Sequence, residues 1–167
     1  YKFASLVVCG GTSVLNIFND LSLKEINWEN ILVTLVDDRL VPDNHEDSNR
    51  LLVKKNLLIN NASEAKFLPL NSKITFYNKI KLPFTVMLLS MGDDGHFASI
   101  FPNMLDDNSI TNPDGMPRVL KTAPQGIPNH ARITMNLAMI LQSKSIFLLV
   151  HGEKKIKIFD MARTNRD

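Results

Sequence analysis

Four short apolar runs, separated by polar turns and by segments of helical periodicity, are typical of buried strands. They cover residues 3–8, 31–36, 85–89 and 145–150 and are rich in Val, Ile, Leu and Phe. Continuous apolar runs of this length fit strands that are covered on both faces. Their alternation with helical segments predicts an α/β fold, an open, mainly parallel sheet with helices on both faces, of the Rossmann-like type.

Helical spacing places apolar residues on one face of the segments between these runs. A first helix is expected to begin at Thr12 or Ser13, and a second at Asp47 or Ser48, because these residues cap helices well. Residues 133–141 and 156–161 are predicted to be further helices with core-facing positions. The stretch 103–130, rich in Asn, Asp, Pro and Gly, is predicted to form mostly connections around a short extended piece at 118–121.

Composition narrows the function classes without naming one. A chain of 167 residues with 44% hydrophobic and 22% charged residues fits a single ordinary domain, 1–167, and we see no internal repeat. A net charge of +2 without a basic stripe argues against nucleic acid as a partner. No apolar run is long enough to predict a membrane span. Cys9 is the single cysteine, which excludes an intramolecular disulfide and suggests a cytoplasmic protein.

Polar side chains follow each of the four predicted strands. They are the glycine turn at 10–13, the acid-acid-base triplet at 37–39, the loop at 92–96 and the segment 151–155. The carboxyl ends of parallel strands share one edge of a sheet, so we expect these four segments to meet in one crevice.

The glycine turn Gly10-Gly11-Thr12-Ser13 has two interpretations. It can be simply a tight strand-to-helix turn with a hydroxyl cap. It can also bind an anion, because glycine backbone N–H groups at a helix start favour phosphate. The spacing matches neither GxxxxGK[ST] nor GxGxxG, which disfavours a nucleotide as ligand.

The triplet Asp37-Asp38-Arg39 can be a turn with a solvated ion pair. At a strand end, however, alternation predicts that Asp37 and Arg39 project to one side and Asp38 to the other. Arg39 would then face a ligand anion. His45 and Asn49, which follow, are interpreted as helix-entry residues that only support the site.

His96 taken alone is an ordinary surface or structural histidine. Its neighbours favour a general base, because Gly92 and Gly95 allow close backbone approach and Asp94 can orient the ring. The histidines of the chain form no HxH or HExxH pattern, so we expect no metal site. Ser99 is not in a GxSxG elbow and is expected to cap or pack.

Together these residues resemble the 6-phosphogluconolactonases, within the larger group that also holds glucosamine-6-phosphate deaminases. The resemblance rests on the turn at 10–13, the triplet at 37–39 with His45 and Asn49, and the Gly-Asp-Asp-Gly-His-Phe-Ala-Ser-Ile-Phe-Pro block at 92–102. Arg-Ile-Thr at 132–134 and Gly152 with Lys155 complete it. The block at 92–102 is the specific element, and the set spans nearly the whole chain.

The resemblance implies an enzyme of carbohydrate metabolism that needs no cofactor. It would hydrolyse 6-phospho-D-glucono-1,5-lactone to 6-phosphogluconate in the oxidative pentose phosphate pathway, with a functional link to glucose-6-phosphate dehydrogenase. His96 would be the general base, Asp94 would support it, and Arg39 would stabilise negative charge. The substrate would be bound by Gly10, Gly11, Thr12, Asp37, Arg132 and Lys155.

Two rival functions use the same crevice. A sugar-phosphate deaminase or isomerase would use Asp37 as ring-carbon base and His96 for ring opening, but such relatives continue Asp-Gly-His into Asn-Glu-Pro-Gly, and this chain does not. A non-catalytic sugar-phosphate-binding domain is the second rival.

The chain departs from the family pattern in its residues and in its extent. Asp38 replaces the usual Glu, and Cys9 and Val14 change the first turn. The resemblance also predicts that the domain is incomplete at both ends and between 70 and 82.

Overall fold

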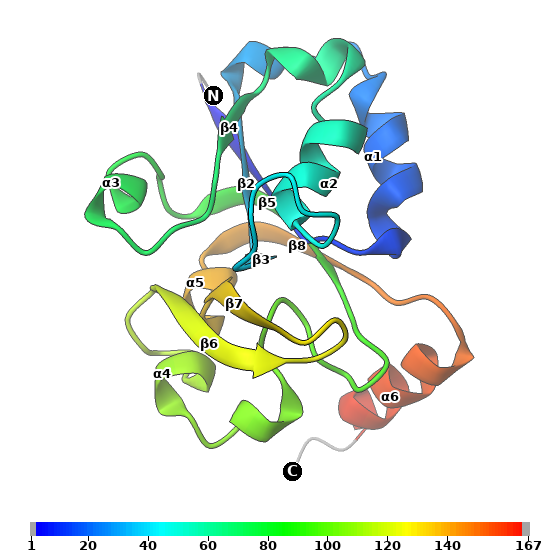
Figure 1. The fold of residues 1–167 in the computed structure, drawn as a ribbon, viewed down its shortest axis with the longest axis vertical. Helices are drawn as coiled ribbons and strands as arrows, with labels where there is room; N and C mark the ends of the chain where they lie inside the picture. Colours follow the sequence, from blue (N-terminus) through cyan, green and yellow to red (C-terminus); the bar gives the residue numbers. More distant parts are fainter. Residues whose placement is uncertain (1–2, 165–167) are drawn as a thin grey trace.

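Five strands form the parallel sheet of the computed structural model, which describes residues 3–164 (Figure 1). Their order is β4-β2-β1-β5-β8, and all four pairings are parallel. The four predicted strands and the α/β fold are confirmed. A fifth strand, β4, is a three-residue edge strand, too short to produce a recognisable sequence pattern. The strands are β1 (Ala4–Val8), β2 (Ile31–Leu35), β4 (Lys66–Leu68), β5 (Phe84–Ser90) and β8 (Ser143–Leu149).

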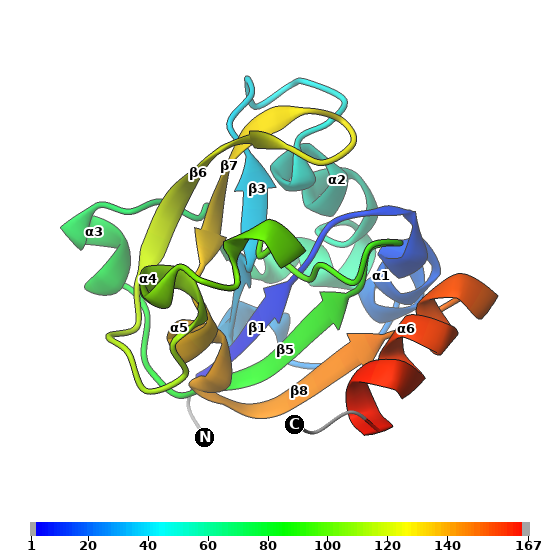
Figure 2. The same ribbon diagram turned by 90° about the horizontal axis from the view of Figure 1, so that it is seen from below.

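Helices cover both faces of this sheet, as predicted (Figures 1 and 2). α1 (Leu15–Ser22) and α2 (Asn49–Asn56) lie on one side, and α4 (Asn108–Thr111) and α5 (Leu137–Leu141) on the other. α3 (Ile74–Tyr77) is a single turn within 70–82, and α6 (Glu153–Thr164) follows β8. None of the helices within residues 3–164 has the length and apolar character needed to cross a bilayer. Four 3₁₀ turns complete the described helices: η1 (Thr12–Val14), η2 (Trp28–Asn30), η3 (Asn60–Glu64) and η4 (Pro102–Met104).

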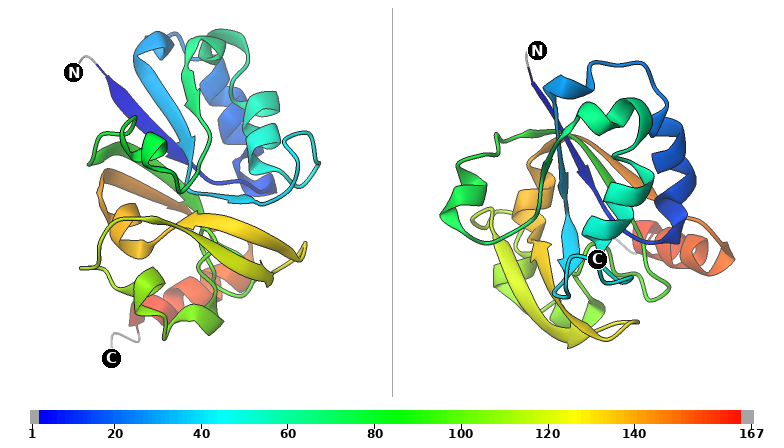
Figure 3. Two further views of the ribbon diagram at one scale, coloured as in Figure 1. Left: turned by 60° about the vertical axis from the view of Figure 1, so that its left-hand side comes forward. Right: turned by 45° about the horizontal axis from the view of Figure 1, so that its top comes forward.

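A second, antiparallel sheet packs beside the first and was not expected from the sequence. Its strands are β3 (Asp37–Arg39), β7 (His130–Met135) and β6 (Val119–Gln125), in the order β3-β7-β6. β3 continues β2 through one residue, Val36. The Val36 N–H donates to the Val8 carbonyl in the parallel sheet, and its carbonyl accepts from the Met135 N–H in the antiparallel one, both at 2.9 Å. Figure 3 shows the resulting β6–β7 ribbon, in yellow, across the parallel sheet from α1 and α2.

The predicted helix at 133–141 is wrong in its first half. Residues 133–135 belong to β7, where Ile133 pairs with Asp38 and Thr134 with Asp37, and the helix begins only at Leu137. Ile133 and Thr134 are β-branched residues that suit a strand. Apolar spacing alone did not distinguish a short strand followed by a short helix from one continuous helix.

The stretch 103–130 contains more structure than predicted. The extended piece expected at 118–121 is the start of β6, which continues to Gln125, and α4 lies before it. Pro124 lies within β6, which is the outer strand of its sheet. Proline is tolerated at such an edge because no ladder hydrogen bond needs its missing N–H.

Helix boundaries agree in part with the predicted caps. Ser48 caps α2, since its side chain accepts from the Leu51 N–H at 3.3 Å. Thr12 and Ser13 do not cap α1 with their side chains; they form the preceding turn η1. α6 has no buried residue, so the core-facing positions expected at 156–161 are wrong.

The main core fills the space between the parallel sheet and the layers on its two sides. Val7, Val33 and Met87 of three adjacent strands are fully buried, as are Phe18 of α1 and Met139 of α5. These side chains fix the strand ends in space, which determines where the polar segments that follow the strands lie.

Asn136 connects this core to the long 103–118 connection. Its Oδ1 accepts from the N–H groups of Arg118 and Met139 at 3.0 Å, and its Nδ2 donates to the carbonyls of Ser109 and Met116 at 3.1 and 3.0 Å. The residue is 1% exposed. The side-chain amide of Asn136 therefore caps α5 and also hydrogen-bonds to three backbone groups of the 103–118 connection.

We predict that Asn136→Ala lowers the free energy of unfolding by about 2–4 kcal/mol, because a helix cap is lost and buried backbone groups lose their partner. Urea denaturation at neutral pH measures this change. The exposed Asn103→Ala serves as control and should stay within about 0.5 kcal/mol of the parent. Equal stability of the two variants would contradict the role of Asn136.

Candidate active site

The polar segments that follow the strands line one pocket at the carboxyl edge of the parallel sheet. Eight of the nine residues predicted for the site line this pocket, and the ninth, Asp94, contacts the imidazole of His96. The expected convergence is therefore observed in the structure. The eight lining residues are Gly10, Gly11, Thr12, Asp37, Arg39, His96, Arg132 and Lys155.

The glycine turn after β1 allows an unusually close contact with the start of α2. A Cβ atom placed on Gly10 would lie 1.9 Å from Oδ1 of Asn49, so any larger residue would displace that side chain. Glycine at position 10 is therefore required by packing, independently of any ligand. The turn brings the first strand and the second helix into contact at the pocket floor.

Asn49 is a pocket residue whose importance the sequence did not reveal. It is buried, and its Nδ2 donates to the Asp37 carbonyl at 3.0 Å, while its Oδ1 accepts from Nη1 of Arg39 at 2.8 Å. Nη1 of Arg39 also donates to the Asp47 carbonyl at 2.9 Å. Asn49 and the Asp47 backbone, rather than Asp37, therefore hold the Arg39 guanidinium in place.

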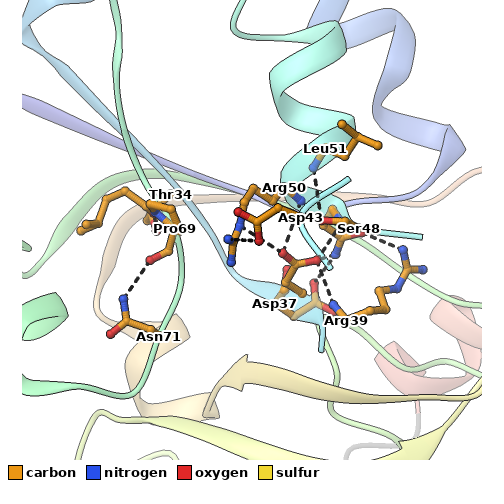
Figure 4. A network of polar contacts seen from close by, with 12 residues as sticks. Thr34, Asp37, Arg39, Asp43, Ser48, Arg50, Leu51, Pro69 and Asn71 are labelled. Atoms are coloured by element: carbon orange, nitrogen blue, oxygen red, sulfur yellow. Dashed lines mark hydrogen bonds and ion pairs between the residues drawn. The ribbon is translucent and has the colours of Figure 1, made fainter. Parts of the chain in front are cut away.

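Asp38 points away from the pocket, as strand alternation predicts. Its Oδ1 accepts from the N–H groups of Arg39 and Asn49 at 2.9 and 2.7 Å, and its Oδ2 lies 3.9 Å from Nε of Arg50. Figure 4 shows the neighbouring side chains Arg39, Ser48 and Arg50 near the start of α2. A carboxylate at a helix N-terminus is electrostatically favourable. Asp38 is therefore structural: it fixes α2 relative to β3.

Two arginines face each other across the antiparallel sheet. Arg39 of β3 and Arg132 of β7 are direct cross-strand partners. Burial, followed by the charge of Arg39, lowers the pKa of Arg132 from its ordinary value. Like charges directly opposite on neighbouring strands are destabilising. Among residues 3–164, the buried Nε of Arg39 also finds no acceptor. An anion in the pocket would relieve this repulsion.

Asp37 lies buried between these arginines and the block at 92–102. Ser99 Oγ donates to Asp37 Oδ2 at 2.6 Å, so Ser99 makes a more specific contact than the expected cap or packing role. Burial raises the pKa of Asp37, against the opposing effects of Ser99 and the nearby positive charges of Arg39 and Arg132. The Asp37 carboxyl group is thus held in place by groups from two distant segments.

The His96 ring is oriented by its own loop. Nδ1 hydrogen-bonds to Oδ1 of Asp94, and the His96 N–H donates to the same oxygen at 3.2 Å. Partial burial alone would raise the pKa of Asp94, but the hydrogen bonds from His96 outweigh burial and lower it. A Cβ on Gly92 would lie 2.2 Å from the imidazole, so glycine is needed there. Because Asp94 is ionised and accepts the Nδ1 proton, Nε2 of neutral His96 carries the free lone pair.

Phe101 connects the histidine to the arginine pair. Its ring stacks on His96 with centroids 4.3 Å apart, and the guanidinium carbon of Arg132 lies 5.3 Å from the same ring. The sequence placed Phe101 in the specific block but gave no sign of this contact, which depends on the antiparallel sheet. The stack fixes the distance between the candidate base and one of the cations.

Lys155 and Cys9 also line the pocket. Nζ of Lys155, in the first turn of α6, lies 3.7 Å from the exposed Oδ1 of Asp93 and adds positive charge to the pocket. Burial raises the pKa of the Cys9 thiol to about 11. The thiol therefore stays protonated at neutral pH and is a poor nucleophile.

A second hollow, lined by Trp28, Asn60 and three glutamates, lies elsewhere on the surface. Its glutamates Glu25, Glu29 and Glu64 would repel an anionic ligand. Within the described part of the chain, the grouping suited to a metal ion is His45, Asp47 and His130, outside the pocket lining. The candidate active site is therefore the pocket at the sheet edge.

Fold and pocket define an α/β protein of the class that binds a small ligand beyond the carboxyl ends of its parallel strands. Arginine and lysine side chains, an imidazole and a carboxylate surround that ligand position. The family model described as glucosamine-6-phosphate isomerases/6-phosphogluconolactonase matches residues 2–167. The chain belongs to this family, which confirms the resemblance inferred from its motifs.

Individual relatives are similar over almost the whole chain. A 6-phosphogluconolactonase of Neisseria meningitidis is 35% identical, covering 95% of this chain and 74% of the relative. One of Pseudomonas aeruginosa is 34% identical, covering 98% and 73%. The crystal structure of a 6-phosphogluconolactonase from Shewanella baltica superposes with a TM-score of 0.82 at 35% identity, covering 96% of this chain and 72% of that one.

We predict that Asp37→Asn changes how stability depends on pH. Burial raises the folded-state pKa of Asp37 above its ordinary value, so between the two values the folded protein holds a proton that the unfolded chain has released. When the pH rises through this window, the free energy of unfolding of the parent therefore falls. The fall is about 1.4 kcal/mol for each pH unit that separates the folded-state and unfolded-state pKa of Asp37. The asparagine variant lacks this contribution.

Urea denaturation of both proteins at several pH values from 4 to 7 measures the difference. The variant should gain stability relative to the parent as the pH rises. Asp38 is present in both proteins, and burial rather than the charge of Asp37 is the main cause of its raised pKa, so most of its contribution is common to both. A stability difference that is constant with pH, or that changes in the opposite direction, would contradict the burial argument.

Proposed function

We propose that this protein hydrolyses 6-phospho-D-glucono-1,5-lactone to 6-phosphogluconate. The observation that carries the proposal is an Asp94-oriented imidazole in the same pocket as Arg39, Arg132 and Lys155. A lactone carbonyl and a phosphate at opposite ends of one small molecule need this combination of a base and several cations. The names of the similar proteins and the family membership support the same reaction.

His96 acts as the general base in the proposed mechanism. Its Nε2 takes a proton from a water molecule while the water oxygen forms a bond to the lactone carbonyl carbon. The resulting imidazolium then returns that proton to the ring oxygen as its bond to the same carbon breaks. Asp94 stabilises the imidazolium and keeps the ring in the required tautomer.

The cations divide between the two ends of the substrate. Arg39 stabilises the oxyanion that develops on the carbonyl oxygen, a contribution that grows in the transition state. Arg132 and Lys155 bind the phosphate together with the glycine turn Gly10-Gly11-Thr12, whose backbone N–H groups suit an anion. The negative charge of the bound substrate also offsets the repulsion between Arg39 and Arg132.

Asp37 positions sugar hydroxyls rather than acting as a base. Its Oδ2 accepts from Ser99 at 2.6 Å, and its backbone carbonyl accepts from Asn49, so the residue is held rigidly. An aldose-ketose isomerisation, the alternative within this family, would need Asp37 to move a ring-carbon proton. The absence of the Asn-Glu-Pro-Gly continuation after His96 also disfavours that alternative.

The proposed reaction places the protein in the pentose phosphate pathway. We infer a cytoplasmic site of action, since the single cysteine is buried and unpaired, as is usual in reducing compartments. An enzyme that oxidises glucose-6-phosphate would supply the lactone, so the functional link to glucose-6-phosphate dehydrogenase is part of this proposal. No direct contact between the two enzymes is required.

We predict that the protein accelerates the loss of freshly prepared phosphogluconolactone above its spontaneous rate, and that His96→Ala lowers kcat roughly 100- to 10,000-fold because the general base is lost. The affinity for 6-phosphogluconate, measured by calorimetry, should change little. The exposed Asn103→Ala, outside the pocket lining, is the control. Binding without turnover by the parent protein would instead support a non-catalytic sugar-phosphate-binding domain.

We predict that Arg39→Ala lowers kcat/KM about 10- to 100-fold, since a charge-assisted hydrogen bond contributes about 1.5–3 kcal/mol. Arg39→Lys should recover only part of this loss, because lysine keeps the charge but not the planar fork. Steady-state kinetics measure both variants, with the exposed Arg118→Ala as control. Unchanged kinetics for Arg39→Ala would remove Arg39 from the mechanism.

A further inference from the structure

Three potential metal ligands meet beside the pocket, where the loop between β3 and α2 touches the β6–β7 hairpin (Figure 2). Nε2 of His130 lies 2.8 Å from Oδ2 of Asp47, and Nδ1 of His45 lies 3.7 Å from the same oxygen. The two imidazole rings are nearly perpendicular, with centroids 5.6 Å apart. The three ligand atoms all lie within 4.8 Å of one another.

The donor set matches the preference of zinc. Zinc sites with an open position use three protein ligands from His, Asp, Glu or Cys and keep the fourth for water. Tetrahedral zinc with bonds of about 2.0–2.2 Å separates neighbouring ligand atoms by roughly 3.3–3.6 Å. The two measured separations from the Asp47 oxygen, 2.8 and 3.7 Å, lie on either side of this range. The two histidine nitrogens lie within 4.8 Å of each other, so the three atoms are close enough to share one ion.

The ligand atoms are also within reach of an ion. Nδ1 of His45 accepts the Asp47 N–H at 3.1 Å, and a bound ion would replace this hydrogen bond. His130 donates its Nε2 proton to Asp47, and this proton moves to Nδ1 or is released when a cation takes its place. The side chains of His45, Asp47 and His130 are 38, 29 and 28% exposed, so an ion can reach them. Within residues 3–164, the Asp47 carboxylate has these two imidazoles within 4.0 Å and no lysine or arginine.

We propose that His45, Asp47 and His130 form a binding site for a divalent transition-metal ion, with zinc as the best fit. The site lies outside the pocket lining and plays no part in the proposed hydrolysis. It would join two elements that supply the facing arginines. Arg39 precedes the loop and donates to the Asp47 carbonyl, and Arg132 lies two residues after His130. A bound ion would therefore act as a cross-link that holds the pocket wall together.

The experiment titrates the metal-free full chain, prepared with a chelator that is then removed, with ZnCl₂ in a calorimeter. We expect one Zn²⁺ per chain. His130→Ala, His45→Ala and Asp47→Asn should each weaken binding by more than about tenfold, the smallest loss expected for an outer-shell group. Circular dichroism checks that each variant is folded. A blue colour on adding CoCl₂ would report tetrahedral coordination independently of calorimetry.

Two matched histidine variants locate the ion. His151→Ala should bind Zn²⁺ as the parent does, because this exposed residue lies outside the cluster. His96→Ala should also retain binding, which separates the proposed site from the Asp94–His96 pair of the pocket. Zinc binding that survives in both His130→Ala and Asp47→Asn, loss of binding in His96→Ala, or no binding by the parent would each overturn the proposal.

Discussion

The arrangement of the site depends on how the chain leaves the parallel sheet at Val36. This buried residue donates its N–H to β1 and accepts with its carbonyl from the end of β7, so each sheet satisfies one of its backbone groups. A buried backbone polar group without a partner is costly. The strand must therefore pass from one sheet directly into the other, which carries Asp37 and Arg39 over the carboxyl ends of β1 and β5.

This transfer also explains the concentration of charge in the pocket. Antiparallel pairing of β3 with β7 places Arg132 directly opposite Arg39, with Asp37 buried nearby. The pairing costs stability in the absence of a ligand, because like charges face each other in a partly buried place. When a phosphorylated substrate binds, its negative charge removes this repulsion. The cations are already held in position, so binding does not have to order them.

The rigidity of the pocket comes from residues that take no direct part in the proposed reaction. Asn49 joins Arg39 to Asp37 and packs against Gly10, Ser99 holds the Asp37 carboxyl, and Phe101 stacks on the candidate base. Fixed geometry of this kind lowers the reorganisation needed during reaction. The His130–Asp47 contact adds a further tie between the two walls, at the place where a metal ion could strengthen it.

By itself, the sequence determined the parallel α/β core and eight of the residues that line the pocket, because buried strands show as continuous apolar runs and polar strand ends converge wherever such strands are parallel. Only the tertiary structure decided the antiparallel sheet, the edge strand β4 and the partners of Asn49, Ser99 and Phe101. Short strands carry too few residues for a periodic signal. Contacts such as His130 with Asp47, 83 residues apart, leave no local trace, because chain topology alone brings them together.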